Sequence, residues 1–157
     1  MREVIKTACG RAMATVHRFA WIGPLLVRLT VGLVFVVTGW GKLHSLANVT
    51  QFFDSLHIPA PHANAVFVSS VELVGGLLLI AGLGARIAAL LLAGVMTVAL
   101  VTAKLPDVHG IVDLAGTLEF VFLTVFIWLL AAGPGSASLD HLITPPRAPS
   151  EKTAAPV

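Results

Sequence analysis

The stretch VELVGGLLLIAGLGAR, residues 71–86, places one carboxylate, Glu72, and a glycine pair at the head of an apolar run that ends at Arg86. An acidic side chain on a helix surface that faces lipid is unfavourable, so such residues normally face other protein or water. Glu72 is therefore expected to point into the interior of a helical membrane bundle. If its helix begins near Ala63, Glu72 lies about 14 Å along the helix axis, close to the middle of a bilayer.

The composition supports a membrane protein. Of the 157 residues, 57% are hydrophobic and 11% are charged, and the mean hydropathy is +0.92. A water-soluble domain of this length cannot bury so much apolar surface. Long apolar runs without strand-like alternation predict an all-α, four-helix transmembrane bundle within a membrane domain over residues 22–141. The predicted spans are approximately residues 24–43, 63–83, 87–103 and 114–132.

Three classes of function receive no support from the sequence. The ten basic residues are scattered among apolar runs and form no patch, so no nucleic acid partner is expected. The single cysteine, Cys9, argues against a membrane thiol oxidoreductase that works through its own dithiol pair. The spacing of His44, His57 and His62 matches no strong metal or haem pattern, so no metal site is predicted.

The basic residues also predict an orientation in the membrane. One side carries Arg2, Lys6, Arg11, Arg18, Arg86, Arg147 and Lys152, whereas the other carries only Lys42 and Lys104. Because cytoplasmic flanks are enriched in Lys and Arg, both termini are expected in the cytoplasm. Residues 1–21 have apolar residues at helical spacing and read as a basic amphipathic helix on the inner surface, with a frayed tail as the alternative. Residues 142–157 read as a disordered, proline-rich tail.

Small and aromatic residues indicate how the helices are arranged. Gly32, Gly39 and Gly41 in the first span allow another helix to approach closely. A ridge of alanines in the third span, Ala89 and Ala93, predicts a packing surface. The loop after the first span contains Phe52, Phe53, Leu56 and Ile58 before Pro59, a pattern typical of a short amphipathic helix on the outer surface.

The candidate intramembrane polar site consists of two acids and two bases. Glu119 lies in the fourth span, Arg28 lies about one and a half turns into the first span, and Lys42 lies at that span's outer end. When the residues are matched by their estimated depth in the membrane, Arg28 is predicted to pair with Glu72, and Lys42 is predicted to pair with Glu119. Two alternatives stay open: Arg28 could snorkel to the headgroups, and Glu72 could be a structural carboxylate held by an arginine or by hydroxyls.

Several motifs occur together in an order that resembles the DoxX family of small four-helix bacterial membrane proteins. They are Arg28 with the LTVGLVF run after it, GWGKL at 39–43, IPAP at 58–61, the 71–86 stretch, Glu119, and GPGSASLD at 133–140. The resemblance covers about residues 22–141. Many members have a histidine near the position of Lys104, so His109, with Asp113 nearby, is the candidate here for an outer-face proton or ligand group.

The resemblance implies a multi-pass protein of the bacterial inner membrane that is associated with a redox complex. In that hypothesis Glu72, Glu119 and their basic partners line a cavity where a quinone head group exchanges protons. One alternative is a non-catalytic scaffold or assembly partner for a cytoplasmic protein, recruited by the N-terminal segment. A small-solute transporter is the third hypothesis, but the sequence lacks the inverted repeats typical of one. A protein partner or a homo-oligomer is expected in addition to the lipid bilayer.

Overall fold

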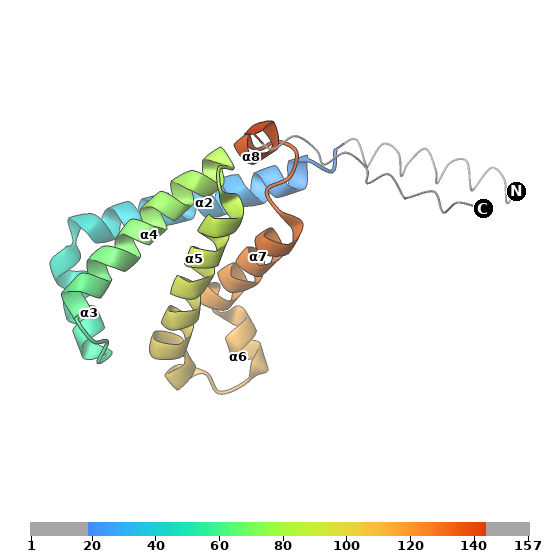
Figure 1. Cartoon of the computed structure of the whole chain (residues 1–157). Coiled ribbons are helices and arrows are strands. Elements are labelled where there is room, and N and C mark those ends of the chain that lie inside the picture. Colours follow the sequence, from blue (N-terminus) through green and yellow to red (C-terminus); the bar gives the residue numbers. More distant parts are fainter. Residues whose placement is uncertain (1–18, 144–157) are drawn as a thin grey trace, which may run out of the picture.

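The computed structural model describes residues 19–143, and all the regular structure in this range is helical (Figure 1). The all-α fold class is therefore confirmed. The predictions for residues 1–18 and 144–157, which include most of the amphipathic segment and of the tail, lie outside the described residues. The elements in chain order are α2 (Ile22–His44), α3 (Leu46–Ser55), α4 (Pro61–Ala81), α5 (Ala85–Ala99), the π-helical turn η1 (Leu100–Lys104), the 3-10 turn η2 (Leu105–Asp107), α6 (Ile111–Gly116), α7 (Leu118–Ala132) and α8 (Leu139–Ile143).

Three helices of the described range are long and apolar enough to cross a membrane. They are α2, α4, and α5 extended through η1 and η2 to Asp107. The fourth predicted span, 114–132, is not one continuous helix, because α6 ends at Gly116 and Thr117 adopts an extended conformation before α7 begins. The remaining helix α7 is apolar but has 15 residues, which corresponds to about 22 Å, less than the roughly 30 Å of a bilayer core.

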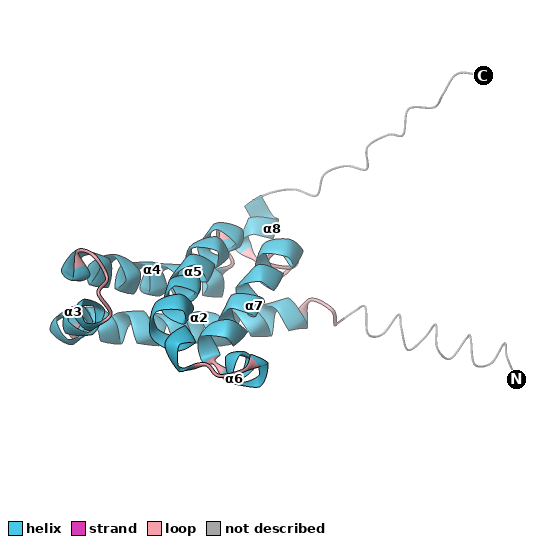
Figure 2. Ribbon diagram, turned by 90° about the horizontal axis from the view of Figure 1, so that it is seen from below, coloured by secondary structure: helices cyan, strands magenta, loops and turns pink. Residues whose placement is uncertain are grey.

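The helices form two antiparallel pairs. Helices α2 and α4 run side by side with α3 at their far end, and α5 and α7 form the second pair with α6 at theirs (Figures 1 and 2). The two pairs meet near α8 and diverge toward α3 and α6, as Figure 1 shows. This divergence separates α3 from α6, and a cavity lined by Lys42, Glu72, Lys104 and Glu119 lies between the pairs.

Glycines set the close approach of α2 and α4. A Cβ atom at Gly32 would lie 2.8 Å from the carbonyl oxygen of Gly76, and one at Gly39 would lie 2.5 Å from the backbone nitrogen of Leu73. No side chain fits at either position without moving the helices apart. The expectation that Gly32 and Gly39 lie at a helix interface is confirmed, whereas Gly41 has nothing within 4 Å of its Cβ position.

The core between the two pairs is apolar. Phe35 of α2 packs edge-on against Phe122 and Phe126 of α7, with ring centroids 5.2 Å apart in both cases. From α5 the core receives Leu92 and the predicted alanine ridge, and both Ala89 and Ala93 are buried. The prediction that α5 serves as a packing surface is therefore confirmed.

Candidate functional site

Glu72 lies on α4, is 1% exposed, and forms an ion pair with α2. Its Oε1 atom is 2.6 Å from Nζ of Lys42. The predicted pairing of Glu72 with Arg28 and of Lys42 with Glu119 is therefore wrong. The reason is helix register: Gly39 contacts Leu73, so Lys42 is about 4.5 Å beyond the contact along α2, whereas Arg28 is about 16 Å away in the other direction.

The second carboxylate oxygen of Glu72 has no hydrogen-bond partner in the part of the chain that the structure describes. Among residues 19–143, Oε2 is buried and accepts no hydrogen bond. Ser69 is one turn away on α4, but its hydroxyl donates to the carbonyl oxygen of Ala65 at 2.6 Å. The hypothesis that hydroxyls hold this carboxylate therefore fails for Ser69. A buried acceptor without a donor lowers the stability of the protein by about 1 to 3 kcal/mol, and by more when the group is charged.

A second acid–base pair joins η1 to α7. Nζ of Lys104 is 3.6 Å from Oε1 of Glu119, and the two side chains are 45% and 23% exposed. Glu119 lies in the first turn of α7, where the helix dipole favours a negative charge. Lys104 ends the π-helical turn, a local deviation that is frequent at functional sites.

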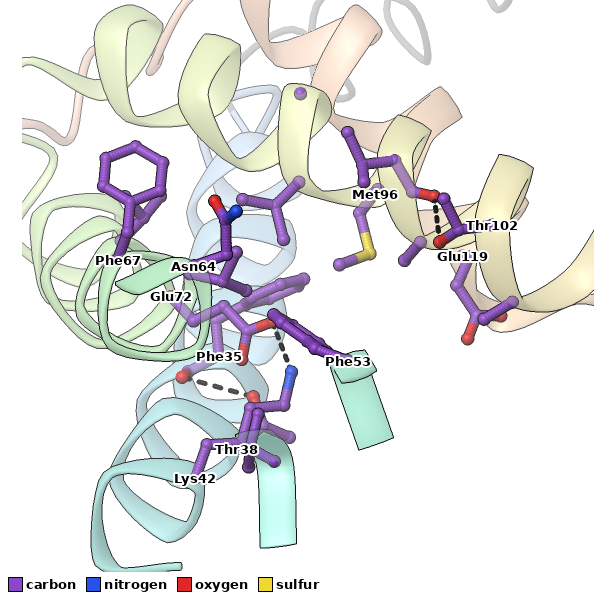
Figure 3. Close-up of a pocket in the computed structure, with 18 of the residues that line it drawn as sticks. Phe35, Thr38, Lys42, Phe53, Asn64, Phe67, Glu72, Met96, Thr102 and Glu119 are labelled. Atoms are coloured by element: carbon purple, nitrogen blue, oxygen red, sulfur yellow. Dashed lines mark hydrogen bonds and ion pairs between the residues drawn. The ribbon is translucent and has the colours of Figure 1, made fainter. Parts of the chain in front are cut away.

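Both pairs line one cavity of about 1170 Å³. The cavity lies between the two helix pairs, and Figure 3 shows Glu72 and Lys42 on one wall with Glu119 on another. Its lining is mainly apolar and comes from α2, α3, α4, α5, η1 and α7. The aromatic and sulfur-containing residues in it are Phe35, Phe52, Phe53, Phe67, Met96 and Phe122. Ligand sites in proteins have this character: apolar walls with a few placed polar groups.

Helix α3 supplies one wall of this cavity. The predicted amphipathic helix is confirmed as Leu46–Ser55, and its Phe52 and Phe53, together with Leu56 and Ile58 after it, face the cavity. The sequence signal was the aromatic pair in an otherwise polar loop. That signal indicated an apolar helix face, but it did not indicate that the face lines the same cavity as Glu72.

Arg28 belongs to a different part of the molecule. Its side chain is 1% exposed, Nη1 donates to the carbonyl oxygen of Pro134 at 2.9 Å, and Nη2 donates to that of Ala137 at 2.6 Å. The snorkelling alternative is therefore wrong, because the guanidinium is enclosed by protein. Arg28 does not line the cavity of Lys42 and Glu72.

The acceptors of Arg28 lie in residues 133–140, which we call the C-terminal latch. The Asp140 carboxylate accepts hydrogen bonds from the N–H groups of Gly84 at 2.7 Å and Ala85 at 3.0 Å, at the start of α5. The N–H of Asp140 in turn donates to the carbonyl oxygen of Gly82 at 3.0 Å. The GPGSASLD motif thus fastens the end of α7 to the α4–α5 turn.

The other predicted polar residues lie apart from the cavity. Nδ1 of His109 is 2.9 Å from the carbonyl oxygen of Asp107, within the same turn, and His109 and Asp113 are both exposed. Neither lines the cavity that contains Glu72 and Glu119. Across residues 19–143, no group of three or more His, Cys, Asp or Glu side chains is positioned to hold a metal ion.

The DoxX family pattern matches residues 23–105, which include Lys42, Glu72 and Lys104. The chain belongs to the DoxX family. It is 33% identical over 124 residues to "Putative oxidoreductase CatD" of Bacillus subtilis, covering 78% of this chain and 87% of that protein. It is 26% identical over 122 residues to "Inner membrane protein YqjF" of Escherichia coli, covering 78% and 92%. Among solved structures, none matches this DoxX-family chain with statistical significance.

Proposed function

We propose that this DoxX-family membrane protein is a subunit of a redox complex and that its cavity binds a quinone-type molecule. One observation carries the proposal: Glu72, a cavity-lining acid, is buried and paired with the partly exposed Lys42, and its second carboxylate oxygen has no partner among the described residues. Ionisable groups inside a membrane are rare and generally functional. The relative named as an oxidoreductase is consistent with a redox association.

The chemistry of the lining fits such a molecule. Aromatic side chains on α2, α3, α4 and α7 can pack against a planar ring. The ammonium groups of Lys42 and Lys104 can donate to carbonyl oxygens, and the carboxylates of Glu72 and Glu119 can accept from hydroxyls. The volume exceeds the roughly 300 to 1,000 Å³ of common ligand sites, which leaves room for part of an apolar tail.

The proposal is tested by what the protein retains during purification. Wild-type protein is isolated from its membranes in a mild detergent, and extracted quinones are quantified by mass spectrometry. We expect a stoichiometric amount in wild type and a loss of at least about tenfold in Glu72→Gln, which changes the acceptor at the cavity wall. Asp54→Asn is the matched control, since Asp54 is an exposed acid on α3 that does not line the cavity. Absence of quinone from the wild type would contradict the proposal.

A second candidate function is a non-catalytic scaffold or assembly partner. It is supported by the placement of Lys42–Glu72 across the closely packed α2 and α4 helices, where an ion pair can set helix register. Under this proposal, deletion of residues 2–18 releases a cytoplasmic partner, whereas Glu72→Gln changes only stability. Mass spectrometry of proteins that copurify with full-length and shortened chains separates the two candidates, and capture of a second, differently tagged copy of this chain tests for a homo-oligomer.

We further propose that the protein lies in the bacterial inner membrane with both termini in the cytoplasm. The Escherichia coli relative is named an inner membrane protein. Arg86 follows the α4–α5 turn, at the same end of the molecule as the start of α2 and α8, as expected if this end is cytoplasmic. A fluorescent protein fused after Val157 should fluoresce, and alkaline phosphatase fused there should be inactive. The opposite pattern would reverse the assigned orientation.

A further inference from the structure

The hydrogen-bonding state of Glu72 limits what can bind beside it. In an ion pair with Lys42 the carboxylate is an acceptor only, and its Oε1 contacts Nζ at 2.6 Å. Its Oε2 is buried and unpaired among the described residues. A molecule that satisfies this oxygen must therefore bring a hydroxyl or N–H donor of its own.

Hydroxyls on the surrounding helices are engaged elsewhere. The hydroxyl groups of Thr38, Ser69 and Thr102 each donate to a carbonyl oxygen on their own helix, about one turn back, at distances of 3.3, 2.6 and 2.8 Å. A rotation of any of these side chains toward the cavity would break a bond already formed. These three hydroxyls are therefore not available as donors to Oε2 of Glu72 in this structure.

Lys42, the basic partner of Glu72, does not require the ligand to carry a hydrogen-bond acceptor. The Lys42 ammonium has three donor hydrogens, and its side chain is 36% exposed, whereas that of Glu72 is 2% exposed. Water can reach the remaining lysine donors when no ligand accepts from them. A ligand that only accepts hydrogen bonds thus gains little at Lys42 and leaves Glu72 Oε2 unpaired.

From this asymmetry we propose that the cavity selects the reduced, hydroxyl-bearing form of its ligand: it binds quinol more tightly than quinone. A quinol hydroxyl donates to Oε2 of Glu72 after a shift of the side chains that cover this oxygen, and its ring lies among the aromatic side chains of the lining, such as Phe53, which lines the same cavity as Glu72 (Figure 3). The same molecule in its oxidised form has only carbonyl oxygens at these positions. This inference rests on the proposed function and adds to it the redox state that is preferred.

The expected preference is roughly tenfold or more, since it reflects one buried charged acceptor that is paired in one complex and unpaired in the other. The test uses full-length wild-type protein in detergent micelles, kept under argon. Decylubiquinol and decylubiquinone are titrated separately and their dissociation constants are measured by calorimetry, with protein-free micelles as the blank. A tenfold tighter binding of decylubiquinol supports the inference.

Two other outcomes are informative in different ways. If both compounds bind with equal affinity, or the quinone binds more tightly, the redox preference is overturned while the quinone-type ligand of the proposed function stands. If neither compound binds, both the preference and the proposed function are overturned. The wild-type measurement alone decides between these outcomes, so the test does not depend on the folding of any variant.

A variant then assigns the preference to Glu72. In Glu72→Gln the side-chain amide can donate to a quinone carbonyl, so the ratio of the two dissociation constants should fall to about one or invert. Asp54→Asn makes the same chemical change on α3, outside the cavity, and should keep the wild-type ratio. A preference that persists unchanged in folded Glu72→Gln protein overturns the assignment.

Discussion

Two buried charges on the α2–α4 pair have opposite surroundings. Arg28 and Glu72 are each 1% exposed, but Arg28 donates to two backbone carbonyls of the C-terminal latch, whereas Glu72 faces a cavity with one oxygen unpaired. The Arg28 end is closed by the latch and by close packing at Gly32 and Gly76. The Glu72 end is open because the helix pairs diverge there (Figure 1). Neither burial nor one unpaired atom distinguishes a structural charge from a candidate ligand group, because Nε of Arg28 is also buried without a hydrogen-bond partner among residues 19–143. The two charges differ in that Glu72 lines a cavity, whereas Arg28 is enclosed by the latch.

The largest expected effect is at the closed end. Arg28→Met removes the donors to Pro134 and Ala137 and should lower the free energy of unfolding by about 2 to 5 kcal/mol, since two carbonyl acceptors lose their hydrogen bonds. Arg28→Lys should restore little, because one ammonium cannot reproduce the guanidinium fork. Unfolding in mixed micelles of rising SDS content measures both variants. Wild-type stability in Arg28→Met would remove the contrast between the two ends.

The next effect concerns the glycine contact between α2 and α4. Gly76→Val should lower the free energy of unfolding by about 1 to 3 kcal/mol, because the new side chain overlaps the backbone of α2. Gly41→Val is the matched control, since a Cβ at Gly41 meets nothing within 4 Å. The same SDS titration applies, and equal destabilisation of the two variants would argue against a close α2–α4 contact.

At the open end, stability and binding should separate. Replacing the ion pair by Lys42→Met with Glu72→Leu should change the free energy of unfolding by less than about 1 kcal/mol or increase it, since apolar groups of similar size avoid the desolvation of two charges. Retention of quinone should nevertheless be lost. Unfolding and quinone content are measured on the same preparation. A strongly destabilised double variant would show that the pair is mainly structural.

The smallest expected effect is at Lys104. Its pair with Glu119 is longer, at 3.6 Å, and about half exposed on the lysine side, so Lys104→Gln should alter the free energy of unfolding by no more than about 0.5 kcal/mol. This variant shows whether the Lys104–Glu119 pair contributes less to stability than the other ion pair of the cavity, Lys42–Glu72. A loss comparable with that of Arg28→Met would place Lys104 among the structural charges.

The fold was largely predictable from local properties of the chain. Apolar runs and helix-compatible spacing predicted α2, α4 and α5, and the aromatic pair Phe52 and Phe53 predicted α3. The interruption of the predicted span 114–132 at Thr117 was missed, because the mean hydropathy of a long apolar run changes little when the run includes one glycine and one threonine. Gly116 and the extended conformation of Thr117 end α6, as expected from the low helix propensity of glycine.

The sequence by itself determined that Glu72 and Arg28 had to be removed from lipid, because neither charge is tolerated against acyl chains. It also indicated where helices could approach, correctly at Gly32 and Gly39 but not at Gly41, where a Cβ atom would meet nothing within 4 Å. Only the tertiary structure decided which charges meet. Partner choice depends on the register between α2 and α4, which is set by many packing contacts distributed along both helices, and depth estimates from single residues cannot resolve a difference of a few helical turns. That register brought Lys42 to Glu72 and left Arg28 to the C-terminal latch.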